Sequence, residues 1–116
     1  MSATLCLRLA AMSGLLVVAL GAFGAHGLKS ILSEYQTQEI WQKAVLYHMF
    51  HTLVVLFLAN RPTPPKGAVV FFLLGICLFS GSLYILAASN IRWLGAITPI
   101  GGVSFLVGWI LVFIYP

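Results

Sequence analysis

The chain has 116 residues, of which 61% are hydrophobic and only 7% are charged, and its mean hydropathy is +1.07. Soluble domains carry about 25% charged residues, so this composition excludes a soluble domain and predicts an integral membrane protein. The formal charge of +4 comes from six basic and two acidic residues without a run of Lys or Arg, which excludes a nucleic-acid-binding surface. The length fits one unit, and residues 1–116 are predicted to form a single transmembrane domain.

The first predicted membrane span covers residues 9–27, close to the roughly 20 residues that cross a bilayer. Its second half is rich in small residues, including Gly24, and Gly21 and Ala25 share one face because they are four residues apart. This face is predicted to pack closely against another helix. A groove for a ligand is the alternative.

The only substantial polar segment, residues 28–39, comes next. Ile31, Leu32 and Tyr35 give it a weak helical periodicity, with polar side chains opposite. The segment is predicted to be either a short helix lying at the membrane surface or a solvated loop.

Three further spans are predicted at residues 40–59, 67–89 and 93–115. Three prolines between residues 60 and 66 require a turn outside the membrane, and only residues 90–92 join the last two spans. Short links place consecutive helices side by side in opposite directions. The predicted fold class is therefore an all-α membrane protein, a four-transmembrane-helix antiparallel bundle.

Glycine and proline mark special backbone positions in the last two spans. Pro99 removes a backbone hydrogen bond and is expected to kink the fourth helix beside Gly101 and Gly102. Gly108 opens a further position of close approach. The complete set of predicted helix-packing residues is Gly21, Gly24, Ala25, Gly81, Pro99, Gly101, Gly102 and Gly108.

An even number of spans places both termini on one side of the membrane, together with the proline turn. Arg8, Arg61 and Lys66 lie on that side, whereas Lys29 and Arg92 lie on the other, with Lys43 partly inside the membrane. The positive-inside rule therefore favours cytoplasmic termini. The chain is predicted to be a multi-pass protein of a bacterial inner membrane.

Polar residues of all four spans collect in the leaflet away from the termini. With a rise of about 1.5 Å per residue, His48 and His51 lie roughly 12 to 17 Å below that membrane surface. The other half of the bundle is almost purely apolar. The sequence predicts a polar vestibule for a solute or a proton, and the alternative is a set of neutral hydrogen-bonded groups that hold the helices together. The candidate vestibule residues are His26, Lys43, Tyr47, His51, Ser80, Ser82 and Thr98.

Lys43 has two interpretations. Glu39 precedes it by four residues, the favourable order for an ion pair on a helix. Alternatively, the long side chain of Lys43 extends to the headgroups without such a partner.

His48 and His51 could face one metal ion or one proton pathway, with His26 as a third group. The only acidic residues, Glu34 and Glu39, lie outside the membrane core, and we predict neither a metal site nor a cofactor. The chain contains no Asp, no HExxH and no GxSxG, so no enzymatic activity is predicted.

Four stretches occur in an order that resembles the DUF423 family of small four-helix membrane proteins, which are YgdD-like or similar to transmembrane protein 256. They are residues 21–26 (GAFGAH), 47–51 (YHMFH), 79–84 (FSGSLY) and 98–105 (TPIGGVSF), followed by Gly108-Trp109. The resemblance covers nearly the whole chain and implies a membrane protein of uncharacterised function. By position it includes His26, Tyr47, His51, Ser80 to Ser82 and Thr98-Pro99. His48 departs from the family pattern, in which Gln is common, so the resemblance implies no role that requires imidazole there.

The sequence predicts a small transporter or channel-like protomer as the leading function. Four helices leave a narrow path, so transport would require a homo-oligomer. The alternative is a non-catalytic accessory or assembly subunit of a larger membrane complex. In both cases the lipid bilayer is the immediate partner.

Overall fold

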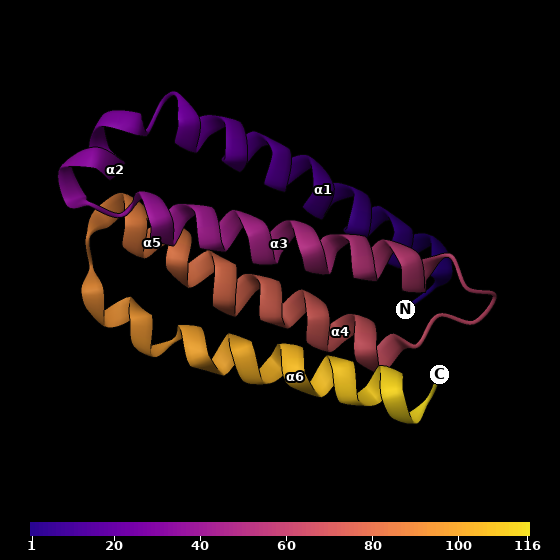
Figure 1. Cartoon of the computed structure of the whole chain (residues 1–116). Helices are drawn as coiled ribbons and strands as arrows, with labels where there is room; N and C mark the ends of the chain where they lie inside the picture. Colours follow the sequence, from indigo (N-terminus) through magenta and orange to yellow (C-terminus); the bar gives the residue numbers. More distant parts are fainter.

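A computed structural model describes residues 1–116 and consists of helices joined by short connections (Figure 1). In chain order the elements are α1 (Ala3–Ala25), α2 (Lys29–Tyr35), α3 (Gln38–Ala59), α4 (Lys66–Gly75), the π-helical segment η1 (Ile76–Ser80), α5 (Gly81–Ser89), the 3-10 segment η2 (Arg92–Ala96) and α6 (Thr98–Ile114). Four stretches are long and apolar enough to cross a membrane: Ala3–Ala25, Gln38–Ala59, Lys66–Ser89 and Arg92–Ile114. The number, order and helical nature of the predicted spans are confirmed.

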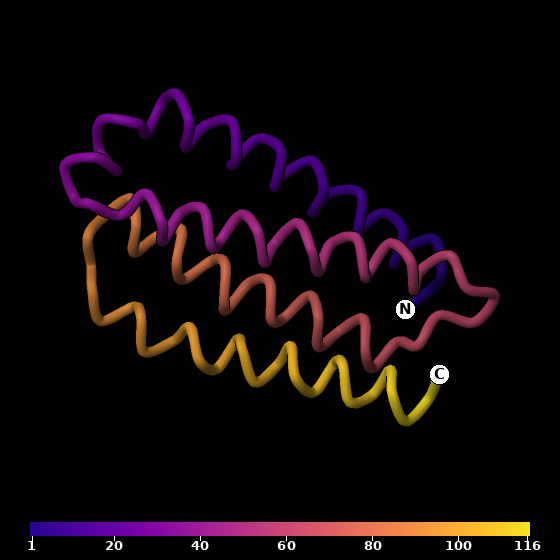
Figure 2. The backbone as a smooth tube through the Cα atoms, in the orientation of Figure 1, coloured from indigo at the N-terminus to yellow at the C-terminus, as the bar shows by residue number.

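The spans lie side by side in chain order and alternate in direction (Figures 1 and 2). α1 packs on α3, α3 packs on the third span (α4, η1 and α5), and the third span packs on α6. Both termini and the proline turn lie at one end, whereas α2 and the connection from α5 to α6 lie at the other. The predicted antiparallel bundle is therefore present, with α1 and α6 at its opposite edges.

The first span begins earlier than predicted, at Ala3 instead of residue 9. The Ser2 side chain accepts a hydrogen bond from the Leu5 backbone N–H at 3.0 Å and caps the first turn. A hydroxyl cap can start a helix wherever the following residues permit it, so hydropathy alone placed this boundary too late.

The polar segment forms the short helix α2, and its end is fixed to the third span. Gln36 ends α2 in a left-handed backbone conformation with φ of 55°. The next residue, Thr37, is fully buried, and its hydroxyl donates to the Ala87 carbonyl at 2.7 Å. Arg92 also donates to the Tyr35 carbonyl at 3.2 Å. Of the two alternatives for this segment, the helix is confirmed.

The third span and α6 interlock through alternating large and small residues. The facing pairs, starting at the α2 end, are Thr98 with Ser82, Gly101 with Phe79, Phe105 with Gly75, and Gly108 with Phe72. On both helices successive pairs are spaced by three or four residues, so the contacts follow a single face. A methyl group on Gly101 would lie 2.3 Å from the Phe79 backbone nitrogen. Glycine therefore allows the two backbones to approach closely.

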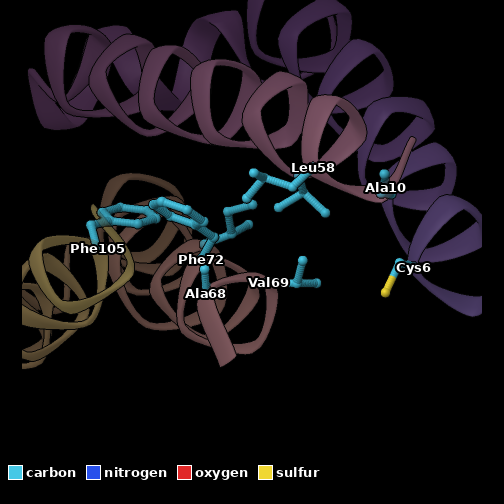
Figure 3. Close-up of a cluster of buried hydrophobic side chains, with 10 residues drawn as sticks. Cys6, Ala10, Leu58, Ala68, Val69, Phe72 and Phe105 are labelled. Atoms are coloured by element: carbon cyan, nitrogen blue, oxygen red, sulfur yellow. The ribbon is translucent and has the colours of Figure 1, made fainter. Parts of the chain in front are cut away.

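An apolar core fills the half of the bundle near the termini. It joins α1, α3, α4 and α6, and Figure 3 shows Leu58 of α3 directed toward Val69 and Phe72 of α4. Cys6 of α1 is fully buried at the edge of this cluster. The predicted apolar half of the bundle is confirmed.

Two predicted backbone features are wrong. Pro99 lies in the first turn of α6, where a missing N–H costs nothing, so it starts the helix and does not kink it. A methyl group on Gly81 would meet no atom within 4 Å, so Gly81 is not a packing position. Instead, its N–H bonds to the Ile76 carbonyl and closes the π-helical turn.

The other predicted packing residues differ in how closely they approach their neighbours. A methyl group on Gly24 would lie 2.1 Å from the Trp41 ring nitrogen, and one on Gly108 would lie 2.8 Å from Phe72. Gly21 and Gly102 have room for a methyl group, at 3.6 and 3.9 Å from their nearest neighbours, and Ala25 is exposed. Gly24, Gly101 and Gly108 are thus the positions of closest approach among the predicted packing glycines.

We predict that Gly101→Ala lowers the stability of the bundle by roughly 1 to 3 kcal/mol, because the added methyl group overpacks against a backbone that cannot move aside. Gly102→Ala is the matched control, since its methyl group finds ordinary van der Waals space. Thermal unfolding in detergent checks this prediction. Equal melting temperatures for the two variants would contradict the close approach at Gly101.

Candidate functional site

Four side chains form a buried hydrogen-bonded chain, the His48 chain, between α1, α3 and α5. His48 is only 3% exposed; its Nδ1 lies 2.9 Å from the Tyr84 hydroxyl and its Nε2 lies 3.0 Å from the Ser13 hydroxyl. The Ser13 hydroxyl lies 2.6 Å from the Thr52 hydroxyl. Thr52 in turn donates to the His48 backbone carbonyl at 2.7 Å.

The partners in the His48 chain assign the position of each proton. The single hydroxyl proton of Thr52 bonds to a carbonyl, so Ser13 must donate to Thr52. The Ser13 oxygen then accepts from the Nε2–H of His48. In the neutral imidazole Nδ1 is the acceptor, and Tyr84 donates to it. All four hydrogen bonds thus run in one direction, from Tyr84 to Thr52.

His51 lies in an aromatic environment. Its Nδ1 is 2.9 Å from the Tyr47 carbonyl, and the Trp109 indole N–H donates to its Nε2 at 3.3 Å. A carbonyl requires a donor and an indole N–H requires an acceptor, so these partners select the neutral tautomer with a proton on Nδ1. The ring stacks on Phe105 with centroids 3.7 Å apart and an interplanar angle of 9°. Trp109 packs edge-on against His51 as well, with centroids 6.0 Å apart.

The buried serines connect neighbouring helices. Ser80 donates to the Ala44 carbonyl of α3 at 2.8 Å, and Ser82 lies 2.7 Å from the Thr98 hydroxyl. Ser104 of α6 donates to the Phe71 carbonyl of α4 at 2.6 Å. No buried side-chain nitrogen or oxygen lacks a hydrogen-bond partner. The polar interior is therefore fully occupied by contacts within the chain.

The structure does not gather the seven candidate vestibule residues in one hollow. Ser82 and Thr98 meet, and the Tyr47 ring lies near His51, with centroids 6.1 Å apart, although Tyr47 itself is 39% exposed. His26 is exposed at the C-terminal end of α1. None of the seven lines either of the two principal hollows.

Lys43 lies on the outside of α3 and is exposed. Glu39 is exposed too, and no ion pair joins the two side chains, so the predicted pair is wrong. An exposed lysine without this partner fits the second interpretation, in which the side chain extends to the headgroups. Nowhere do three His, Cys, Asp or Glu side chains come together, so the three histidines do not share a site.

The larger principal hollow is a groove of about 570 Å³, open on one side, between α1, α2 and α3. We call it the α1–α3 groove. Its twelve lining residues are Gly21, Gly24, Ala25, Lys29, Leu32, Ser33, Gln38, Trp41, Gln42, Val45, Leu46 and Met49. The second hollow, of about 290 Å³, is entirely apolar and lies between α3 and α6 near Phe57 and Trp109. Both hollows open at the outer surface of the bundle.

Several residues of the site were not anticipated from the sequence. Ser13, Thr52 and Tyr84 complete the His48 chain, and Trp109 holds His51. Ser13 is the clearest case, because it is an isolated hydroxyl in an apolar helix. Ser13 of α1 and His48 of the antiparallel α3 lie at a similar depth in the membrane. This similar depth is the signal in the sequence that could have paired them.

The family model described as "Protein of unknown function (DUF423)" matches residues 20–102. The UPF0382 membrane protein YwdK of Bacillus subtilis is 47% identical over 112 residues, covering 90% of this chain and 89% of the relative. The UPF0382 inner membrane protein YgdD of Escherichia coli is 44% identical over 119 residues, covering 98% and 90%. No solved protein structure matches the chain at a significant level.

We predict that Ser13→Ala lowers stability by about 1 kcal/mol, because His48 loses its acceptor and Thr52 loses its donor. Ser30→Ala, at an exposed serine without a side-chain partner, is the control and should be neutral. Thermal unfolding in detergent measures both variants. If Ser13→Ala has the same melting temperature as the wild type, the His48 chain does not hold α1 to α3.

Proposed function

The chain belongs to the DUF423 family of membrane proteins of unknown function. From the geometry of its interior and its surface, we propose that it is a non-conducting accessory subunit of a larger membrane complex. The relative YgdD is named an inner membrane protein, and we propose the same membrane for this chain. The observation that carries the proposal is the complete pairing of the polar interior.

A conducting path requires polar groups that face a water-filled space. Here the hydroxyls of Ser80, Ser82 and Ser104 bond to the neighbouring helix or to their own backbone, which leaves them unavailable to a passing solute. The two principal hollows lie on the outside of the bundle. Hydrogen-bonded polar groups in the interior and hollows on the outer surface support a protein that acts through its surface.

The α6 edge supplies an apolar surface for a membrane-embedded partner. Large side chains along the outer face of α6 are exposed, namely Ile100, Val103, Leu106, Ile110 and Phe113. The apolar hollow of about 290 Å³ lies beside this face, between α3 and α6. A hollow lined by seven hydrophobic residues can accept a large apolar side chain from a neighbouring helix.

Transport is the second candidate, and the His48 chain is the observation that favours it. Its four hydrogen bonds run in one direction from Tyr84 to Thr52, as they do in a proton relay. The chain ends at a backbone carbonyl of its own helix, so conduction would require a rearrangement or a homo-oligomer. This requirement ranks transport below the accessory role.

We predict that the purified protein in liposomes gives proton flux equal to that of protein-free liposomes, measured with an internal pH-sensitive dye. Tyr84→Phe, which removes the first donor of the His48 chain and keeps the ring, should give the same result. Tyr115→Phe, at an exposed tyrosine near the C-terminus, is the control. Flux above background that Tyr84→Phe abolishes and Tyr115→Phe retains would establish the relay and overturn the accessory role.

We further predict that the protein, purified from its native membrane in a mild detergent, retains a second polypeptide in a fixed ratio. Leu106→Ala should lower the recovered partner by at least about fivefold, because interface truncations at key contacts cost more than about 1 kcal/mol. Leu15→Ala on α1 is the control, since Leu106 and Leu15 are 61% and 63% exposed. Recovery of self-associated protein alone would contradict the proposal.

A further inference from the structure

We propose that the α1–α3 groove binds an anionic phospholipid, with the phosphate at Lys29 and one acyl chain along Val45, Leu46 and Met49. This inference goes beyond the accessory role, because it names a small-molecule ligand and a site away from the α6 edge. It depends on the shape of the groove, the order of its lining residues and their charge.

The groove has the size of a ligand site. Its volume of about 570 Å³ lies within the range of roughly 300 to 1,000 Å³ that is typical of small-molecule pockets. Three elements form its walls: the second half of α1, the short helix α2 and the first half of α3. Because one side is open, a lipid can enter from the bilayer without any opening of the bundle.

The lining changes from mainly polar to apolar along α3. Gln38 and Gln42 lie in the first turns of α3, and Lys29 and Ser33 of α2 lie at the same end of the bundle. Val45, Leu46 and Met49 follow farther along α3. From Gln38 to Met49 the helix rises about 16 Å, close to half of the roughly 30 Å hydrocarbon core. The groove therefore has the polarity and depth of one lipid leaflet.

Lys29 is the only charged residue in the lining. It is exposed, it has no ion pair, and neither Glu34 nor Glu39 lines the groove. An unpaired cation at the headgroup level attracts anionic lipids, and each such residue contributes about fivefold in affinity, which corresponds to about 1 kcal/mol. The hydroxyl of Ser33 and the amides of Gln38 and Gln42 add hydrogen-bonding groups for a phosphate or glycerol.

The open space exists because α1 carries small residues opposite α3. Gly24 lets the Trp41 ring lie against α1, where the indole N–H donates to the Leu20 carbonyl at 3.1 Å. Trp41 thereby forms part of the groove wall. Gly21 and Ala25 add little bulk to the wall, since Gly21 has room for a methyl group and Ala25 is exposed.

A transmembrane helix from a partner fits this groove less well than a lipid does. A helix with its side chains is about 10 to 12 Å wide and would continue past Met49 to the other membrane surface. The groove ends near Met49, about halfway along α3, and its α2 end carries Lys29 and polar side chains. A phospholipid matches this short length and this charge, because its phosphate can lie at Lys29 and its acyl chain can follow the apolar part.

Native mass spectrometry of the purified full-length protein tests the proposal. The probes are dioleoyl phosphatidylglycerol and dioleoyl phosphatidylcholine, which share their chains and differ in headgroup charge. We expect one phosphatidylglycerol bound per chain, with about a fivefold preference over phosphatidylcholine. Glycerol phosphate, which has no acyl chains, should not compete. Equal binding of both lipids, or competition by glycerol phosphate, would overturn the assignment.

Two pairs of variants locate the site. Lys29→Gln should remove the preference for phosphatidylglycerol, whereas Lys43→Gln, at an exposed lysine at the same end and outside the groove, should retain it. Ala25→Phe should lower binding of both lipids several-fold by filling the groove. Ala22→Phe, at an exposed alanine of α1 outside the groove, should not.

Equal effects within either pair would overturn the proposal. All of these measurements use the isolated protein, so their failure would leave the partner experiment and the accessory role untouched. Conversely, loss of the partner would not affect lipid binding. Size-exclusion chromatography of each variant separates loss of lipid from loss of folding.

Discussion

The fit of phenylalanine against glycine between the third span and α6 determines most of the arrangement. Lipid does not drive apolar helices together, so their association depends on close packing and on hydrogen bonds between them. Gly75 and Gly108 each receive a phenylalanine ring from the other helix, Gly101 lies against the Phe79 backbone, and together these contacts fix the register of the two helices. That register brings Thr98 within 2.7 Å of Ser82. Removal of any one pair would therefore disturb a polar contact as well as a packed surface.

Hydrogen bonds to backbone carbonyls then connect the remaining helices. Trp41 donates to Leu20 of α1, Ser80 donates to Ala44 of α3, and Ser104 donates to Phe71 of α4. Polar side chains therefore join neighbouring helices, and in the half near the termini the hydrogen bond from Ser104 to the Phe71 carbonyl supplements the packing of the apolar core. This use of polar groups accounts for the histidines without any solute. It favours a protein whose activity resides on its outer surface.

Hydropathy predicted the four spans, because membrane thickness sets the length of an apolar span, and the short connections predicted their antiparallel order. Depth could be read from the sequence, but rotation about each helix axis could not. His26 and His51 were both placed in one leaflet, yet only His51 turns inward. His48 was left out of the predicted site because Gln is common at this position in the family, although it is among the most buried polar residues. The π-helical turn at Ile76–Ser80 changes which side chains of α5 face the neighbouring helices, and no pattern in the sequence predicted it.

The contact between α1 and α3 gives one face of α1 two uses. Leu20 meets Trp41 and Ser13 meets His48, and each helix advances by seven residues between the two contacts. Two hydrogen bonds in the same register prevent α1 from sliding along α3, so the space beside Gly21 and Ala25 keeps its shape. The small residues of α1 were expected to serve either packing or a groove. Gly24 serves the packing, because the Trp41 ring lies against it, and its neighbours Gly21 and Ala25 line the groove.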